Sequence, residues 1–591
     1  MKILRYTSAI LLAGTLLNSG CSKGFLDKPA YGGLSNEIVA NKDGVNYLLV
    51  GAYAALDGQG NPTGALGGGG NGWEASPTNW IYGSVVGGDA HKGSEGTDQT
   101  PINEIAISQP NVSNSFFNTK WKAVFEGVAR CNNTLKLMAQ AKDMSDAERT
   151  QVQAEARFLR GHYYFELRKM FKKVPYVTEA TADPLVSNDA EIWPNIEADF
   201  KYAMDNLPPT QPQVARANKW AAKVYLAKTY LYQKKYPEAL QLFNDAITNG
   251  VTSNGLPYAL TANFEDNFDA SKKNNSESVF AIQMSANDGT NNIANANMGD
   301  MLNFPGNFKC CGFYQPSFDL VNSYRVDGSG LPYLDDYNQH PIKSDMGIRS
   351  ADSFSPDTDP IDPRLDWTVG RRGLPYHDWG YFAGSDWIRD HSQRYAGPYA
   401  TKKMVYWNYN QDKYLDDHSW APGTAINVLL IRFADVLLMT AECAAETGDL
   451  GRAKDLVNQV RHRMIDHPEN WVHDYKDPAK PILGFDPAKP ISNYSIGEYP
   501  AFPNVDFARK AIRFERKLEL AMEGHRFFDL SRWGIADQVL NAYFAFEGQI
   551  TQDVQGGHFT KGKNEYFPIP QRQIDLTLKD GKPVLKQNDN F

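Results

Sequence analysis

The sequence predicts a mainly α-helical protein, with paired helices as a scaffold and long irregular segments between them. Two observations lead to this prediction. Apolar residues recur at helical spacing over several stretches. Two of these stretches also place small residues twelve positions apart, at Ala227 and Ala239 and again at Ala441 and Ala453. Tetratricopeptide helix pairs have this spacing, because small side chains let two helices approach closely. Few and short strands are expected.

The composition is that of a globular protein with an acidic balance. The 591 residues are 42% hydrophobic and 22% charged, and the formal net charge is −9. A nucleic-acid-binding protein needs a basic face that displaces counterions, so this balance disfavours nucleic acid as a partner. Aromatic residues make up 12% of the chain, and many of them lie outside the helical patterns.

The first twenty residues predict an export signal. Lys2 and Arg5 precede a short apolar run at 9–17, well below the about 20 residues that span a bilayer. A small residue stands directly before Cys21, as in lipoprotein signals, so we expect this cysteine to be acylated and to become the mature N-terminus. An ordinary secretory signal with an incidental cysteine is the alternative. If Cys21 is acylated, residues 21–41 form a lipid-anchored tether.

The other cysteines lack the spacing of a metal site. Cys131 and Cys443 lie in helical patterns and are expected to be small buried hydrophobic residues. Cys310 and Cys311 are adjacent, and in an exported protein they could close a vicinal disulfide; two free thiols are the alternative. We predict neither a metal ion nor a cofactor.

Helical patterns dominate residues 42–248, the first part of the expected scaffold. Helices are expected at about 42–56, 118–139, 145–171 and 193–206, followed by a helix pair within 218–248. The stretch 58–117 interrupts them and begins with many glycines, which do not form regular structure cheaply. This loop carries a cluster of aromatic and polar side chains: Trp73, Trp80, Tyr82, Asp89, His91 and Lys92.

Between 249 and 423 helical periodicity is scarce, and Asn, Asp, Gly, Pro and aromatic residues dominate. An irregular insertion of this length in a compact domain is expected to form a functional surface. Short strands are expected at Ser278–Gln283 and Lys403–Trp407. The second helix pair, within 424–464, completes the scaffold.

The sequence contains no recognisable catalytic motif of the hydrolase, zinc-protease, phosphate-loop or dinucleotide type. The paired carboxylates of a glycoside hydrolase have no fixed sequence signature, because their separation is a property of the fold. Aromatic rings beside Asp, Asn, Arg and His on glycine-rich loops suit sugars, whose C–H faces stack on rings while their hydroxyls bind planar polar groups. The alternative for each ring is a place in a loop-rich core.

Several stretches, taken in order, resemble the SusD/RagB family of outer-membrane nutrient-binding lipoproteins, and together they cover nearly the whole chain. They are GFLD from Gly24, NWIYGSVVGGDAHKGS from Asn79, CNNTL from Cys131, AEARFLRGHYYFEL from Ala154, DPRL from Asp362, LLIRFADVLLMTAECAAETGD from Leu429, the charged stretch 507–534 and YFPIPQRQID from Tyr566.

The resemblance implies one domain over 42–591, with about four tetratricopeptide-like units that hold an irregular binding region. It implies a lipoprotein in the cell outer membrane that faces the exterior and delivers oligosaccharide or polysaccharide to a SusC-type TonB-dependent transporter. The family is not enzymatic, and some members bind peptides. A surface glycoside hydrolase and a pure interaction scaffold are the alternatives. Ligand contacts are expected from the first loop and from six residues of the insertion: Phe313, Tyr314, Arg371, Arg372, Trp379 and Trp387.

The charged stretch 507–534, within the C-terminal part 505–591, is dense enough in charge to suggest an active site, but its spacing favours a structural clamp. Its apolar residues recur at helical spacing and must face a core. Glu515, Glu519 and Glu523 form a like-charged row, so each needs a cationic partner from elsewhere. We therefore predict a buried or half-buried ion-pair clamp that joins this helix to the scaffold. Four residues after Gly524 are expected to fold back toward the glutamates: His525, Arg526, Asp529 and Arg532.

Overall fold

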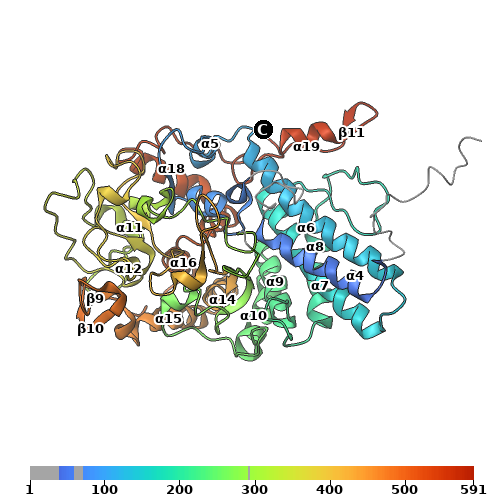
Figure 1. The fold of residues 1–591 in the computed structure, drawn as a ribbon, viewed down its shortest axis with the longest axis horizontal. Helices are drawn as coiled ribbons and strands as arrows, with labels where there is room; N and C mark the ends of the chain where they lie inside the picture. The colour runs from blue at the N-terminus through green and yellow to red at the C-terminus, as the bar shows by residue number, and fades with distance from the viewer. Residues whose placement is uncertain (1–38, 59–70, 291–292) are drawn as a thin grey trace, which may run out of the picture.

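The computed structural model describes residues 39–58, 71–290 and 293–591. The expected export signal, Cys21, the tether and most of the glycine run lie outside the described residues. Long helices fill one side of the molecule and irregular segments fill the other (Figure 1). The predicted mainly α-helical class is confirmed. Among the described helices, none combines the length and the apolar character that crossing a bilayer requires.

The N-terminal helices form one continuous packed layer, in which each helix contacts the next. They are α4 (Lys42–Ala54), α6 (Ser115–Gln140), α7 (Asp146–Phe171), α8 (Trp193–Asn206), α9 (Lys219–Tyr232) and α10 (Tyr236–Asn249). A capping box between Ser145 and Glu148 starts α7. Gly127 lets α6 lie close to α7, because a Cβ there would stand 2.3 Å from the ring of Tyr163. Cys131 is buried in this layer, as predicted.

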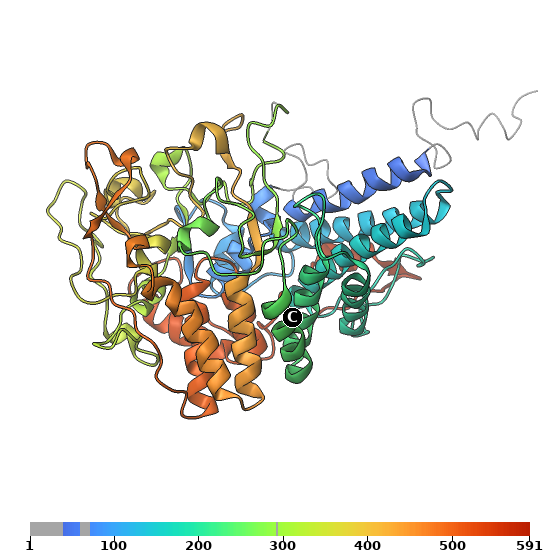
Figure 2. The ribbon, with the colours of Figure 1, turned by 90° about the horizontal axis from the view of Figure 1, so that it is seen from below.

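The second helix pair consists of α14 (Phe433–Glu446) and α15 (Leu450–Ile465), and α16 (Val505–Glu519) packs against both. Figure 2 shows these helices side by side, next to α9 and α10. The small residues that predicted the pairs are fully buried: Ala227, Ala239, Ala441 and Ala453. Cys443 is also buried. After α16 the chain continues through α17 (Arg526–Trp533) and α18 (Ala536–Glu547).

The irregular half is held by short helices and two-stranded antiparallel sheets. The helices are α5 (Pro101–Ala106), α11 (Phe318–Ser323), α12 (Arg364–Thr368), α13 (Gln411–Tyr414) and α19 (Gln571–Leu576). The sheets pair β1 (Ala90–Gly93) with β3 (Phe313–Pro316), β2 (Ser278–Ile282) with β8 (Val428–Arg432), β4 (Val369–Gly370) with β5 (Ala400–Thr401), β6 (Leu415–Asp416) with β7 (Gly423–Thr424), β9 (His473–Tyr475) with β10 (Phe485–Pro490), and β11 (Leu578–Lys579) with β12 (Lys582–Pro583).

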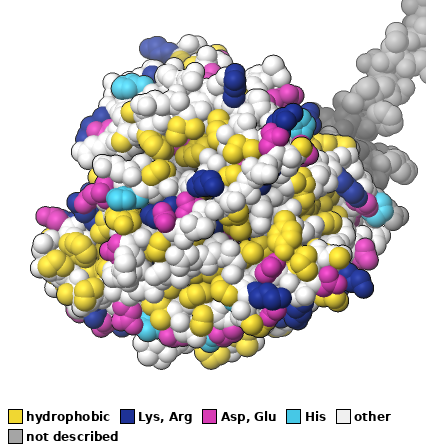
Figure 3. Space-filling view, turned by 90° about the vertical axis from the view of Figure 1, so that its left-hand side faces the viewer, with side chains coloured by type: hydrophobic (Ala, Val, Ile, Leu, Met, Phe, Trp, Pro, Cys, Tyr) yellow, Lys and Arg dark blue, Asp and Glu magenta, His cyan; other side chains and the backbone are white. Residues whose placement is uncertain are grey.

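One expected strand is present and the other is not. The strand at 278 is β2, but in Lys403–Trp407 the first two residues form a turn and the other three have no regular secondary structure. The reason is the burial of Lys403, whose Nζ donates to the backbone carbonyls of Glu519 and Ala521 and to the carboxylate of Glu523. Figure 3 looks onto the end that carries α11, α12 and the β9–β10 hairpin, where apolar side chains lie in separate patches among charged ones.

The predicted ion-pair clamp is present, and it is fully buried. Glu519 lies within 2.7 to 2.9 Å of the guanidinium groups of Arg364, Arg432 and Arg463. Burial alone would raise the pKa of Glu519, but these guanidinium groups hold it well below its ordinary value. Five carboxylates face five cations in the whole cluster, which we call the charge cluster: Glu277, Asp362, Glu515, Glu519 and Glu523 with Arg364, Lys403, Arg432, Arg461 and Arg463.

The expected fold-back toward the glutamates is wrong for the three residues of α17. His525, which directly precedes α17, does interact electrostatically with Glu523. Asp529 binds Arg516 at 2.8 Å and Arg532 at 2.9 Å, and Arg532 also pairs with Glu442 of α14. For Arg526 no ion pair is found among the described residues. The partners of the glutamates come instead from α12, α15, β8 and the 403 turn, which a pattern within the stretch itself could not indicate.

Candidate ligand-binding face

The aromatic residues expected in the first loop lie in the core. The indole of Trp80 is buried and donates from Nε1 to the carbonyl of Gly299 at 3.1 Å. Tyr82 is buried as well, and its hydroxyl donates to the carbonyl of Glu74 at 2.7 Å. Both rings belong to the short π-helix η3 (Trp80–Val85), which packs against the backbone of Gly524. As placed, neither ring offers a surface to a ligand.

The polar residues of the same loop are also interior. His91 lies 2.8 Å from Glu547 and 2.9 Å from Asp553. Burial alone would lower the pKa of His91, but these two carboxylates raise it to about 10, so the imidazole is charged. Burial lowers the pKa of Lys92 to about 8 and raises that of Asp89 to about 6. His91 ties β1 to α18 and to its following loop, Lys92 donates to the carbonyls of Glu95 and Asp98, and Asp89 accepts from the backbone N–H of Met522, so none of the three faces solvent.

Most of the residues chosen in the insertion are buried too. Phe313 and Tyr314 lie in β3, and the Tyr314 hydroxyl bonds Ser84 at 2.8 Å. Arg371 pairs with Asp366 at 2.7 Å, and Arg372 donates to backbone carbonyls. Trp379 and Trp387 are the two predicted ligand-binding residues that keep accessible surface, since both are half-buried. Both pack against Phe308, at ring separations of 4.8 and 5.5 Å.

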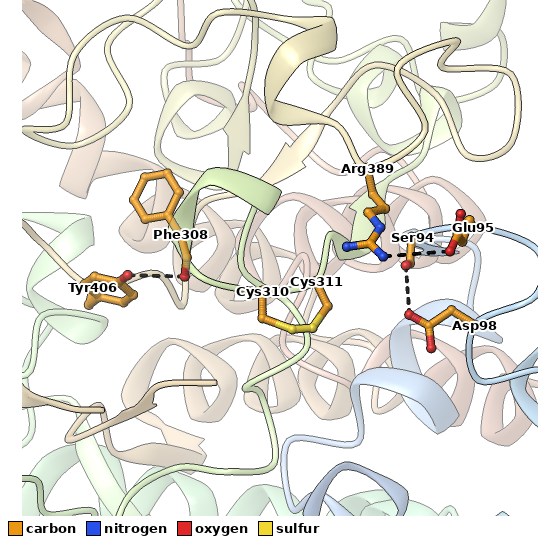
Figure 4. Close-up of a disulfide and its surroundings, with 8 residues drawn as sticks. All are labelled: Ser94, Glu95, Asp98, Phe308, Cys310, Cys311, Arg389 and Tyr406. Carbon is orange, nitrogen blue, oxygen red and sulfur yellow. Dashed lines mark hydrogen bonds and ion pairs between the residues drawn. A yellow bond between two sulfur atoms is a disulfide. The ribbon is translucent and has the colours of Figure 1, made fainter. Parts of the chain in front are cut away.

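Two residues after Phe308 the chain forms the adjacent disulfide Cys310–Cys311 (Figure 4). The surface around it is charged and exposed. Lys309 pairs with Asp417 at 2.9 Å, and Arg389 lies 3.8 Å from Glu95. The backbone N–H of Ser94 donates to the carbonyl of Gly312 at 2.6 Å, which fixes the first loop against the disulfide segment.

Trp420 is the most exposed tryptophan of this region, with 61% of its surface accessible. Its ring meets that of Trp73 edge to face, with centroids 5.8 Å apart and an interplanar angle of 88°. The Trp73 indole is itself held, because its Nε1 donates to Gln99 at 3.1 Å. Trp73, which was expected to contact the ligand, therefore supports a neighbouring platform. Sequence reasoning missed Trp420, a lone tryptophan whose only local signal is its place in a polar turn.

These residues come from four chain segments, and the ion pairs Lys309–Asp417 and Arg389–Glu95 join the segments beside the disulfide. We call this surface the disulfide face and define it by Glu95, Lys309, Cys310, Cys311, Trp387, Arg389, Asp417 and Trp420. It offers a fixed aromatic ring together with charged hydrogen-bond donors and acceptors. No group of His, Cys, Asp or Glu able to hold a metal ion is found in the described part of the chain.

Comparison with known proteins gives consistent results over most of the chain. The family described as "SusD family" matches residues 276–591, and one described as "Starch-binding associating with outer membrane" matches residues 78–231. SusD-like protein P25 of Formosa agariphila is 25% identical over 511 residues, which cover 83% of this chain and 81% of that protein.

Solved structures share the fold. A SusD superfamily protein of Bacteroides vulgatus has a TM-score of 0.66 at 21% identity and covers 94% of this chain and 100% of its own. Surface glycan-binding protein A of Bacteroides thetaiotaomicron, in complex with laminarihexaose, has a TM-score of 0.61 at 19% identity, with 93% and 99% covered. The helical scaffold with its irregular face is thus the architecture of SusD-like proteins. The family match spans more than half of the chain, and the chain belongs to the SusD family.

Proposed function

We propose that this protein is a surface lipoprotein that binds oligosaccharide or polysaccharide at the disulfide face and delivers it to a SusC-type TonB-dependent transporter. The observation that carries the proposal is the exposed ring of Trp420, fixed on Trp73. An apolar ring that stays exposed to water lacks the free energy that burial would give it. A sugar ring recovers this free energy when its C–H face stacks on the indole.

The charged rim of the disulfide face suits the hydroxyls of a sugar. Arg389 and Glu95 are about half exposed and lie 3.8 Å apart, so their hydrogen-bonding groups are not fully used by each other. Lys309 and Asp417 are also exposed. Charge-assisted hydrogen bonds to neutral hydroxyls give orientation and specificity. Surface glycan-binding protein A of Bacteroides thetaiotaomicron is described as a binding protein, which supports a function without catalysis.

Delivery and anchoring rest on the family and on the N-terminal sequence. One matching family is described as associating with the outer membrane, and Cys21 follows an export signal, which supports a lipid anchor. Mass spectrometry of the protein from membranes tests the acylation of Cys21, and Cys21→Ala is expected to release the protein from the membrane. Co-purification of a barrel transporter with the tagged wild-type protein tests the transporter as partner.

Calorimetric titration against a panel of glycans, including laminarin and starch, tests the binding. Trp420→Ala is expected to weaken binding about five- to tenfold, because one stacking platform contributes about 1 kcal/mol. Tyr47→Ala is a matched control, since Tyr47 is 76% exposed on α4, outside the face. Unchanged affinity in Trp420→Ala would contradict the site. Tight binding of peptides with no glycan binding would replace the sugar by a peptide, and release of shorter products would indicate a hydrolase.

A further inference from the structure

A second aromatic surface lies on the other side of the chain segment that supports the disulfide face. Tyr406 packs against Phe308, with ring centroids 5.9 Å apart, and so belongs under that face. The next residue, Trp407, points away from the disulfide face toward the β9–β10 hairpin. Its ring centroid lies 6.4 Å from that of Phe485. Between this segment and the hairpin is a cleft of about 480 Å³. Clefts of about 300 to 1,000 Å³ are the size that encloses small ligands.

The walls of the cleft are aromatic rings set nearly at right angles. Trp407 makes an angle of 71° with Tyr409 and 70° with Phe485, and Trp367 makes 81° with Phe485. Tyr409 keeps 49% of its surface exposed although its hydroxyl is held by Asp269 at 2.7 Å. Trp407 and Phe485 are half-buried and Tyr409 is exposed, so these three rings can meet the planar apolar face of a ligand, while the buried Trp367 supports them from the core.

Polar groups are placed among these rings. Asp378, in the cleft wall, accepts the backbone N–H groups of Asn408 and Tyr409, both at 2.8 Å and each on a different oxygen. Each of its oxygens keeps a further lone pair for another donor.

The charges of the cleft select against an acidic ligand. The charged residues that line it are Asp378, Glu469 and Lys476, two anions and one cation. A carboxylated or sulfated sugar would meet a net negative site at short range, which is unfavourable. A neutral sugar instead donates its hydroxyls to the carboxylates and stacks on the rings.

We infer that this cleft is a second saccharide-binding site, which takes a short neutral segment of the glycan while the disulfide face binds another part. The inference rests on the proposed function for the class of ligand. Its consequence is bivalency: two weak sites on one protein raise the affinity for a polymer that reaches both, whereas a short oligosaccharide fills each site independently.

The test is calorimetric titration of the full mature chain with a neutral trisaccharide and with the parent polymer. Wild-type protein is expected to bind two trisaccharides, and Tyr409→Ala one, with a fall in polymer affinity of tenfold or more. Ile482→Trp narrows the cleft from its exposed rim without removing a buried contact, and it is expected to act like Tyr409→Ala. Tyr47→Ala again serves as the matched control.

The outcomes separate the two proposals. A stoichiometry of one in the wild type, with no effect of Tyr409→Ala or Ile482→Trp, overturns the second site and leaves the disulfide face in place. Loss of all binding in Tyr409→Ala with none lost in Trp420→Ala keeps the cleft and overturns the disulfide face. Absence of glycan binding by the wild type overturns both. Circular dichroism of each variant confirms that the fold is kept.

Discussion

Replacement of Glu519 by Gln gives a quantitative test of the charge cluster. The variant keeps the size of the side chain but removes one negative charge, so the balanced cluster is left with one excess cation. Three guanidinium groups lie within 2.7 to 2.9 Å of the carboxylate, all of them buried. The Gln amide also brings N–H donors toward these donors. Removal of one partner from a buried ion pair costs about 3–5 kcal/mol.

Equilibrium unfolding in urea measures this loss at pH 7. Glu238→Gln is the control, since Glu238 is exposed on α10 and a surface change of this kind stays within about 0.5 kcal/mol. The pKa of Glu519 is lowered in the folded state, so its contribution is complete above the unfolded pKa of about 4.3 and is lost as the pH falls through the folded pKa. The difference in the free energy of unfolding between wild type and variant should therefore shrink below about pH 4.3. A loss under about 1 kcal/mol at pH 7 would refute the reasoning.

Three further changes test other parts of the interior by the free energy of unfolding. His91→Gln should cost about 3–5 kcal/mol at neutral pH; because the folded pKa of His91 is raised to about 10, the wild-type advantage should be complete below about pH 6.5 and vanish as the pH rises through 10. Gly83→Ala should cost about 3 kcal/mol or more or prevent folding, since its Cβ would stand 1.8 Å from the carbonyl oxygen of Gly524. Burial lowers the pKa of His162 to about 4, so the wild type should lose stability as the pH falls from 6.5 to 4. His162→Gln should reduce that loss, and an equal slope of unfolding free energy against pH in both proteins would contradict the prediction.

The helical elements could be predicted from the sequence because each is encoded within a few turns. Ala227 and Ala239 lie in two successive helices, and their spacing was enough to indicate the pair. The ligand-binding residues could not be predicted in this way. An aromatic ring in a glycine-rich loop looks the same whether it is buried or exposed. For Trp80 and His91 the difference is made by Gly299 and Glu547, which are 219 and 456 positions away.

The charge cluster was predicted in kind but not in its members. The row of glutamates indicated that partners were needed, and this depended only on spacing along one helix. The identity of the cations that pair with these glutamates depends on how α12, α15 and β8 pack against α16, which is a property of the whole fold. Trp420 could not be predicted even in kind, because the exposure of a single ring leaves no periodic pattern in the sequence.

The position of the charge cluster bears on how such a protein can change its cargo over evolutionary time. Each of its charged members needs a partner in another element, so a single replacement is penalised and only paired replacements are neutral. The charges of the disulfide face are exposed and the ring of Trp420 is mostly exposed, so single replacements there cost little stability. Replacements are therefore penalised in the interior and tolerated at the surface, so the face can change in a few loop residues while the same scaffold is retained.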